Sequence, residues 1–230
     1  MTSLSLSHHL DIIKMTQPVE VKLYHLPPTK LIPNSKHPLI QYPGLNKDRS
    51  LKDVYNLYHS NGWNTQWIIK YGSTQQSHYH STTHECMTVM SGSATLRFGV
   101  ADTVEDLEEN THGNGKEEGG IEIQANAGDV FIIPAGVAHK TFDTGVGTPD
   151  FEILTPAYDR PLEEEDFDKV LPDIKLSGFT MMGAYPLGGG WDFKVGGEDA
   201  GVYERVWGVA KPAKDPALGE SVDGLVGLWK

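Results

Sequence analysis

The stretch from residue 60 to 143 is a series of short apolar segments separated by turn residues. The first, "WNTQWIIKYG", is rich in aromatic and β-branched residues and ends at Gly72. The next, "CMTVMSGSATLRFG", indicates two strands joined by a hairpin turn at Ser91-Gly92-Ser93. Many short strands with frequent turns are typical of a β-sandwich or β-barrel. We therefore predict an all-β fold, with one barrel because no internal repeat is evident.

The strand pattern continues through "GIEIQANAGDVFIIPAG" and "AHKTFD". In the first of these, apolar residues alternate at Ile121 and Ile123, and a turn follows at Ala127-Gly128-Asp129. Between the strands lies a polar, acidic excursion, residues 101–120, which we expect to be a long hairpin loop too acidic to pack. Downstream, "RPLEEEDFDKVLPDI" predicts a short helix with acids in its first turn and Pro172 at its end. Residues 211–230 have a proline spacing that indicates an extended tail along the surface.

Composition narrows the class of protein. The net charge of −12 argues against a nucleic-acid partner, since phosphates demand a basic surface. No apolar run approaches the roughly 20 residues needed to cross a bilayer, and we expect no membrane partner. The single cysteine, Cys86, excludes an intramolecular disulfide, and with no evident secretory signal this favours a cytoplasmic protein. Residues 1–18 are expected to be a flexible extension, and Met15 is an alternative start.

Three histidines and a glutamate are concentrated in "HYHSTTHE", residues 78–85. On a strand, His78 and His80 would share one face, and Tyr79 would take the other. If the chain reverses at Ser81–Thr83, Glu85 returns beside them, while His139 opens a later strand. Three imidazoles and one carboxylate from separate strands would suit Mn, Fe, Co, Ni, Cu or Zn and leave coordination positions open.

Other interpretations of the histidines remain at this point. An isolated His-x-His pair is more often a surface or core pair than a metal site. His80 and His84 are four residues apart and would align on a helix. However, Ser-Thr-Thr between them is poor helix material, so we do not expect His84 to be a ligand.

Two longer motifs favour the metal site. "GSTQQSHYHSTTHECMTVMSG" resembles the first cupin motif, with its fixed positions at Gly72, His78, His80, Glu85 and Gly92. "GDVFIIPAGVAHKTFD" resembles the second, with fixed positions at Gly128, Pro134, Gly136, His139 and Asp143. The one departure is Asp143, where the family usually has Asn.

The strings "SATLRFG" and "MMGAYPLGGGWDF" further resemble the YjlB-like group of single-domain cupins, over roughly residues 60 to 210. The resemblance implies a single jelly-roll β-barrel with a metal at its mouth, held by His78, His80, Glu85 and His139. It also implies a cupin domain at 19–210, with its core at 60–145 and 178–195 and a short helical insertion at 146–177. A homodimer is expected too, with residues 19–60 offering an arm for the contact.

The resemblance leaves two functions open. The first is a metal-dependent enzyme, either a dioxygenase or a related lyase or isomerase, acting on a small oxygen-rich organic molecule. In that case Glu85 would be a ligand, and Asp143 or a tyrosine in the cavity would carry a proton. The alternative is a small-molecule-binding or sensor cupin without turnover. We expect Trp67 to lie in the core. By strand parity the residues that shape the cavity are Met87, Val89, Thr141 and Asp143, together with Gln66 or Lys70 from the preceding strand.

Overall fold

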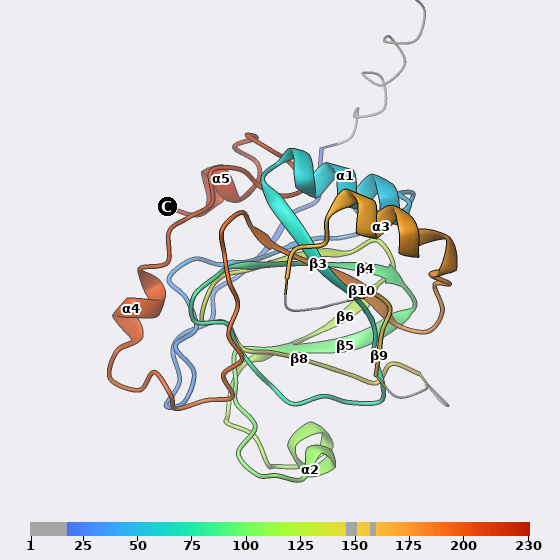
Figure 1. Cartoon of the computed structure of the whole chain (residues 1–230). Helices are drawn as coiled ribbons and strands as arrows, with labels where there is room; N and C mark the ends of the chain where they lie inside the picture. Colours follow the sequence, from blue (N-terminus) through green and yellow to red (C-terminus); the bar gives the residue numbers. More distant parts are fainter. Residues whose placement is uncertain (1–17, 146–150, 157–159) are drawn as a thin grey trace, which may run out of the picture.

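The computed structural model describes residues 18–145, 151–156 and 160–230. Two antiparallel sheets enclose the core (Figure 1), one with the strand order β1-β2-β7-β4-β10-β3-β9 and the other with the order β6-β5-β8. The prediction of an all-β fold of jelly-roll type is confirmed. The strands are β1 (Lys22–Tyr24), β2 (Leu39–Tyr42), β3 (Trp63–Lys70), β4 (Glu85–Ser91), β5 (Ser93–Phe98), β6 (Ile121–Asn126), β7 (Val130–Ile133), β8 (His139–Phe142), β9 (Glu152–Ile153) and β10 (Thr180–Pro186).

Strand alternation divides the apolar residues into two cores. On β4, Met87 and Val89 face the interior between the sheets, and Cys86 faces the opposite side. On β7, Phe131 and Ile132 divide in the same way. Because side chains alternate with period two, one strand serves both an inner core and an outer core. Gly92 makes the tight turn between β4 and β5 with a φ of 74°, a conformation that favours glycine.

Helices cover the outer core (Figure 1). The apolar face of α1 contributes Val54 and Tyr58, and α3 and α5 add Phe167 and Leu225. Ser50 and Asp53 form a reciprocal capping box that starts α1. The helices are α1 (Leu51–Ser60), α2 (Leu107–His112), α3 (Glu164–Val170), α4 (Tyr203–Trp207), α5 (Leu225–Leu228) and the 3₁₀-helix η1 (Leu171–Asp173).

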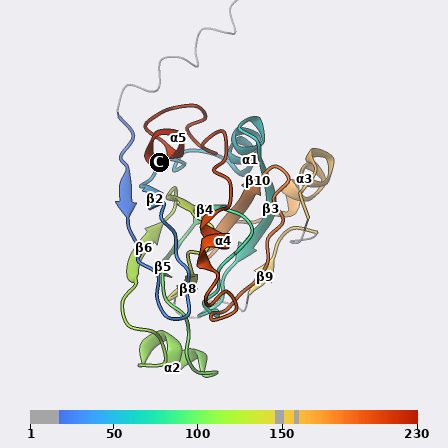
Figure 2. The same cartoon turned by 90° about the vertical axis from the view of Figure 1, so that its left-hand side faces the viewer.

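Residues 19–60, the segment expected to offer an arm for a dimer contact, pack against the rest of their own chain. Strand β2 pairs with β7 of the same chain, and α1 packs on the sheet. This region is therefore part of the domain. Figure 2 shows β1 and β2 along one edge of the larger sheet. Residues 1–17 of the predicted extension lie outside the described residues.

The acidic segment 101–120 is a connection between paired strands, as predicted, but it packs against the sheet. It contains α2, whose Asn110 and Thr111 are buried. Arg97 on β5 donates hydrogen bonds to the carbonyl oxygens of both residues, at 2.8 and 2.6 Å. Lys140 on β8 forms a buried ion pair of 3.1 Å with Asp102. These two cations on the outer face of the smaller sheet hold the acidic loop against it. The acidic composition of the loop had led us to expect that it would not pack.

The predicted helix in the insertion is α3, which ends at Val170, two residues before Pro172. The C-terminal segment, predicted as an extended tail along the surface, is anchored at its end. It includes α5, and the Trp229 side chain, 1% exposed, donates a hydrogen bond of 2.9 Å to the Pro38 carbonyl. Within the described part of the chain, no helix is long and apolar enough to span a membrane.

Replacing Lys140 should destabilise the protein strongly, because it leaves the Asp102 carboxylate buried without its cation. We expect Lys140→Met to lower the free energy of unfolding by about 3 kcal/mol in urea denaturation. A double variant, Lys140→Met with Asp102→Asn, should recover part of that loss. The control is Lys169→Met, which removes an exposed ion pair with Glu165 and should cost less than about 0.5 kcal/mol. Equal effects of the two single variants would contradict a packed loop.

Candidate metal centre

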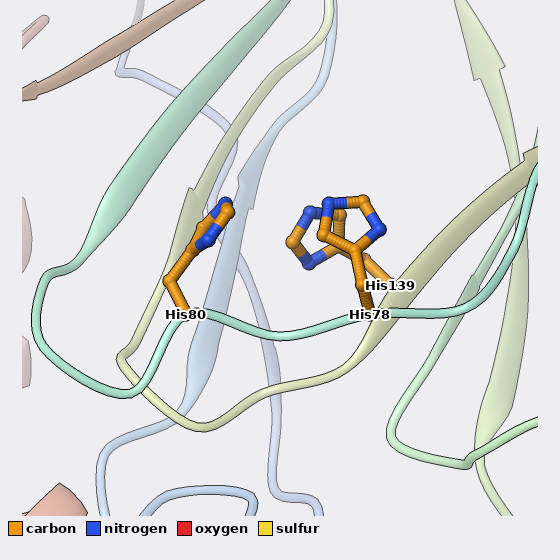
Figure 3. Close-up of side chains that lie close together, drawn as sticks. All are labelled: His78, His80 and His139. Atoms are coloured by element: carbon orange, nitrogen blue, oxygen red, sulfur yellow. The ribbon is translucent and has the colours of Figure 1, made fainter. Parts of the chain in front are cut away.

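Three histidines converge at one end of the space between the sheets (Figure 3). His78 and His80 lie on the segment before β4, and His139 opens β8 and forms a backbone bridge with His78. One ring nitrogen from each histidine lies within 4.8 Å of the other two. Tyr79, between the first two, points the other way into a separate small cluster with Ile32. The strand-parity prediction for this segment is confirmed.

Backbone carbonyl groups orient all three imidazoles through their Nδ1 atoms. His78 Nδ1 lies 3.3 Å from the Gln76 oxygen, and His139 Nδ1 lies 3.3 Å from the Val137 oxygen. His80 Nδ1 bonds the Asp192 carbonyl oxygen. A carbonyl oxygen only accepts, so each Nδ1 carries the hydrogen. In the neutral rings, Nε2 is then left with a lone pair, which is the form that binds metals.

The Glu85 carboxylate completes the group. Its Oε1 atom accepts a 2.5 Å hydrogen bond from the Tyr185 hydroxyl. Its Oε2 atom lies 3.5 Å from His80 Nε2 and 3.2 Å from His139 Nε2. Despite these short distances, Oε2 is buried and has no partner in hydrogen-bond geometry among the described residues. Since a buried carboxylate oxygen without a hydrogen bond is costly, this arrangement favours a cation between the carboxylate and the imidazoles.

The electrostatics of the cluster point the same way. Burial would raise the pKa of Glu85, but the nearby imidazoles of His80 and His139 hold it well below its usual value. Burial would lower the pKa of His80, but the Glu85 carboxylate raises it above the usual value. For His78, burial and the two other histidines lower the pKa well below the usual value. The cluster therefore stabilises positive charge beside Glu85 while keeping His78 neutral.

A cavity of about 280 Å³ opens beside these four residues. Its walls include Met87 of β4 and residues from β3, β10 and the loops above them. Trp67, which was expected only in the core, both packs in the inner core and lines this cavity. The remaining lining residues are Ile69, Tyr71, Gln75, Gln76, Phe151, Tyr185, Trp191 and Phe193.

Comparison with known proteins agrees with the fold and the position of the histidine cluster. Residues 58–170 match the family model described as Cupin. The chain therefore contains a cupin domain over these residues. It is 28% identical over 214 residues to the uncharacterized protein YjlB of Bacillus subtilis (strain 168), covering 91% of this chain and 97% of that one.

Solved structures show weaker likeness to this cupin. Oxalate decarboxylase of Lactobacillus farciminis, in a formate complex, is 14% identical, with a TM-score of 0.27, covering 53% of this chain and 25% of that one. Procruciferin, the 11S globulin of Brassica napus, is 11% identical, with a TM-score of 0.30, covering 77% of this chain and 33% of that one. The cupin thus spans a third or less of each of these proteins' length, and likeness at this level says nothing about its activity.

The glycine-rich segment "PLGGGWDF" supports the histidine cluster through its last residues. Its Asp192 accepts hydrogen bonds of 2.6 Å from both the backbone N–H and the hydroxyl of Ser81. Phe193 stacks on the His78 ring, with centroids 4.2 Å apart. The segment therefore holds His78 and His80 in place. No local pattern signalled this, because the contacts join residues more than 100 positions apart.

A bulge in β3 extends the site. β10 pairs Gly183 with Trp67 and Ala184 with Thr65, so Gln66 is the extra residue. Gln66 Oε1 accepts a 2.8 Å hydrogen bond from the Trp191 indole, and Trp67 donates one of 3.0 Å to the Tyr185 hydroxyl. Bulges commonly re-aim side chains next to functional sites. Here the bulge allows consecutive residues to support the cavity wall.

The other candidate residues lie elsewhere. His84 accepts a hydrogen bond from the Ala135 N–H, and burial lowers its pKa to about 4, as expected of a neutral structural histidine. Asp143 lies at the exposed end of β8, with its carboxylate 3.6 Å from His112. Among the described residues it is not part of the cavity lining, so a proton-carrying role for Asp143 remains an untested sequence prediction. Buried Cys86 lies on the outer face, away from the cavity.

The Tyr185 hydroxyl should matter for metal affinity, because it is the group that orients the Glu85 carboxylate. We expect Tyr185→Phe to weaken Zn(II) binding about tenfold to a hundredfold in a chelator-competition titration. Tyr24→Phe, which removes a hydroxyl bonded to Gln41 far along the chain from the site, is the control and should bind as the wild type does. Unchanged affinity in Tyr185→Phe would show that the carboxylate needs no such support.

Proposed function

We propose that this cupin is a metal-dependent enzyme acting on a small organic molecule, with His78, His80, Glu85 and His139 as ligands. The observation that carries the proposal is the Glu85 Oε2 atom, which is buried without a hydrogen bond and faces two imidazole Nε2 atoms. Several groups rich in lone pairs aimed at one point need a cation between them. Nitrogen and oxygen donors in this ratio suit Mn, Fe, Co, Ni, Cu or Zn.

The residues around the cluster support a catalytic rather than a purely structural metal. Structural zinc sites are usually closed shells rich in cysteine, whereas this cluster borders an open cavity. When bound, such a metal supplies Lewis acidity or a site for oxygen activation. The chain itself orients the imidazoles by their Nδ1 bonds and keeps the Glu85 carboxylate in one position through Tyr185. Aromatic walls make the surroundings of these groups largely apolar, which strengthens their electrostatic effects.

Metal analysis tests the ligand assignment. The protein purified without a histidine tag should hold about one equivalent of a divalent transition metal, measured by elemental analysis. His78→Ala and Glu85→Gln should each lose most of it, because the first removes an imidazole donor and the second replaces an anionic carboxylate ligand by a neutral amide. His112→Ala is the matched control: this histidine is half-exposed on α2, outside the cluster, and its loss should leave the metal content unchanged. Full metal in both ligand variants would refute the assignment.

Turnover distinguishes the enzyme from a binding or sensor protein. We expect the Fe(II), Mn(II), Ni(II) or Zn(II) form to convert at least one member of a panel of small carboxylates, diketones and phenolics. Oxygen consumption with product formation would indicate a dioxygenase, and conversion without oxygen uptake would indicate a lyase or isomerase. Tight binding of a compound with no conversion in any metal form would instead favour the binding protein.

A further inference from the structure

The cavity beside the cluster has walls that are mainly aromatic. Strands β3 and β10 and the loops that flank them contribute aromatic rings to its lining: Trp67, Tyr71, Tyr185, Trp191 and Phe193. Ile69, Met87 and Phe151 add further apolar surface. At about 280 Å³ the cavity is near the lower end of ligand sites in proteins. Its shape and lining therefore suit a small ligand with an apolar, planar body.

The charged residues in the cavity lining restrict the class of ligand further. Among the described lining residues there is no lysine or arginine, and Glu85 contributes a negative charge. For a ligand with two or more negative charges, the metal would be the only positive charge in the cavity. Any charge that the metal does not balance would carry a desolvation cost and weaken binding. A polyol would also be poorly matched, because each buried hydroxyl needs a hydrogen-bond partner. The lining offers few: the amides of Gln75 and Gln76 and two tyrosine hydroxyls, of which that of Tyr185 is already donated to Glu85.

Of the two tyrosine hydroxyls in the lining, that of Tyr71 is the one not donated to Glu85. The Tyr71 side chain lines the cavity and is only 5% exposed. Within the described part of the chain, no group forms a hydrogen bond with its hydroxyl, although the ring packs edge-on against Trp67. A phenol is protonated at neutral pH, so this hydroxyl has a hydrogen to donate. A donor that lines a ligand cavity and has no protein partner among the described residues is available to an acceptor on the ligand.

We propose that the cavity binds an uncharged or singly charged molecule that carries two adjacent oxygen atoms on an apolar ring, such as a cyclic hydroxyketone or a catechol. The adjacent oxygens face the metal held by the histidine–glutamate cluster, and Tyr71 donates a hydrogen bond to one of them. The ring lies among the aromatic walls. This inference rests on the proposed metal centre, and it refines the oxygen-rich substrate expected from the sequence to one with few oxygens and an apolar body.

Calorimetric titration of the Zn(II)-loaded protein tests the class of ligand, because zinc binds without redox chemistry. The probe is maltol, a cyclic hydroxyketone. Oxalate is the contrast that keeps two adjacent oxygen donors but has two charges and no ring. The O-methyl ether of maltol keeps the ring and loses the chelating hydroxyl. We expect maltol to bind at least about tenfold more tightly than either contrast, as burial of the ring and chelation both contribute.

The Tyr71→Phe variant tests the specific contact. It should weaken maltol binding about fivefold to twentyfold, the loss expected for one hydrogen bond in a buried site, while the zinc content stays unchanged. Tyr203→Phe is the matched control, because its hydroxyl bonds the Lys30 carbonyl far from the cavity. That control should leave maltol binding within about twofold of the wild type, since surface changes of this kind are near neutral. Thermal melts of both variants confirm that the fold is kept.

The outcomes separate this inference from the proposed function. Protein that binds zinc but prefers oxalate, or binds maltol and its ether equally, overturns the ligand class and leaves the metal centre standing. Equal maltol affinity in wild type and Tyr71→Phe overturns the role of Tyr71. Protein that holds no zinc in the elemental analysis overturns the metal centre itself, and the ligand class with it.

Discussion

The Glu85 carboxylate lies at the start of β4, buried between two sheets, and most of the site is arranged around the charge it carries. One oxygen accepts a hydrogen bond from the Tyr185 hydroxyl, and that hydroxyl accepts a hydrogen bond from the Trp67 indole N–H. The other oxygen faces the imidazoles of His80 and His139 without a hydrogen bond. A buried carboxylate is stable only with opposite charge beside it. The convergence of imidazoles on this point follows from that requirement, and so does the inference that a metal ion supplies the charge.

Strand alternation explains how the fold accommodates such a site next to an apolar core. On β4, the residues that follow Glu85 on the same face, Met87 and Val89, belong to the inner core. The site is therefore the polar end of an otherwise apolar face. The loop carrying Asp192 and Phe193 covers that end and holds the first two histidines. Rigid strands position the carboxylate and His139, and the loop contacts complete the geometry.

The acidic segment 101–120 packs on the outer face of the smaller sheet, where it supplies partners for two buried cations. Arg97 and Lys140 are buried on strands β5 and β8, where cations need partners. Asp102 and the carbonyl groups at the end of α2 supply them. Because β8 also begins with His139, the packing of this loop and the position of one imidazole depend on the same strand. The loop is thus a support for the site as well as a connection.

Local patterns in the sequence predicted the strands, the hairpin at Gly92, helix α3 and the grouping of His78 with His80, since each depends on alternation, turns or caps within a few residues. A reversal of the chain at Ser81–Thr83 and a later strand beginning at His139 made Glu85 and His139 candidates for that group, and the resemblance to the cupin motifs implied all four residues as ligands. Tyr71, Tyr185 and Trp191 were not predicted as parts of the cavity, nor was the packing of α2 or of Trp229. These features depend on which strands pair and which loops cross the mouth of the fold. Tyr185 and Glu85, for example, are 100 residues apart and meet because β10 pairs with β4. The sequence by itself determined the faces of the strands, because alternation is a property of the local backbone; only the tertiary structure decided which side chains share the cavity, because long-range strand pairing brings them together.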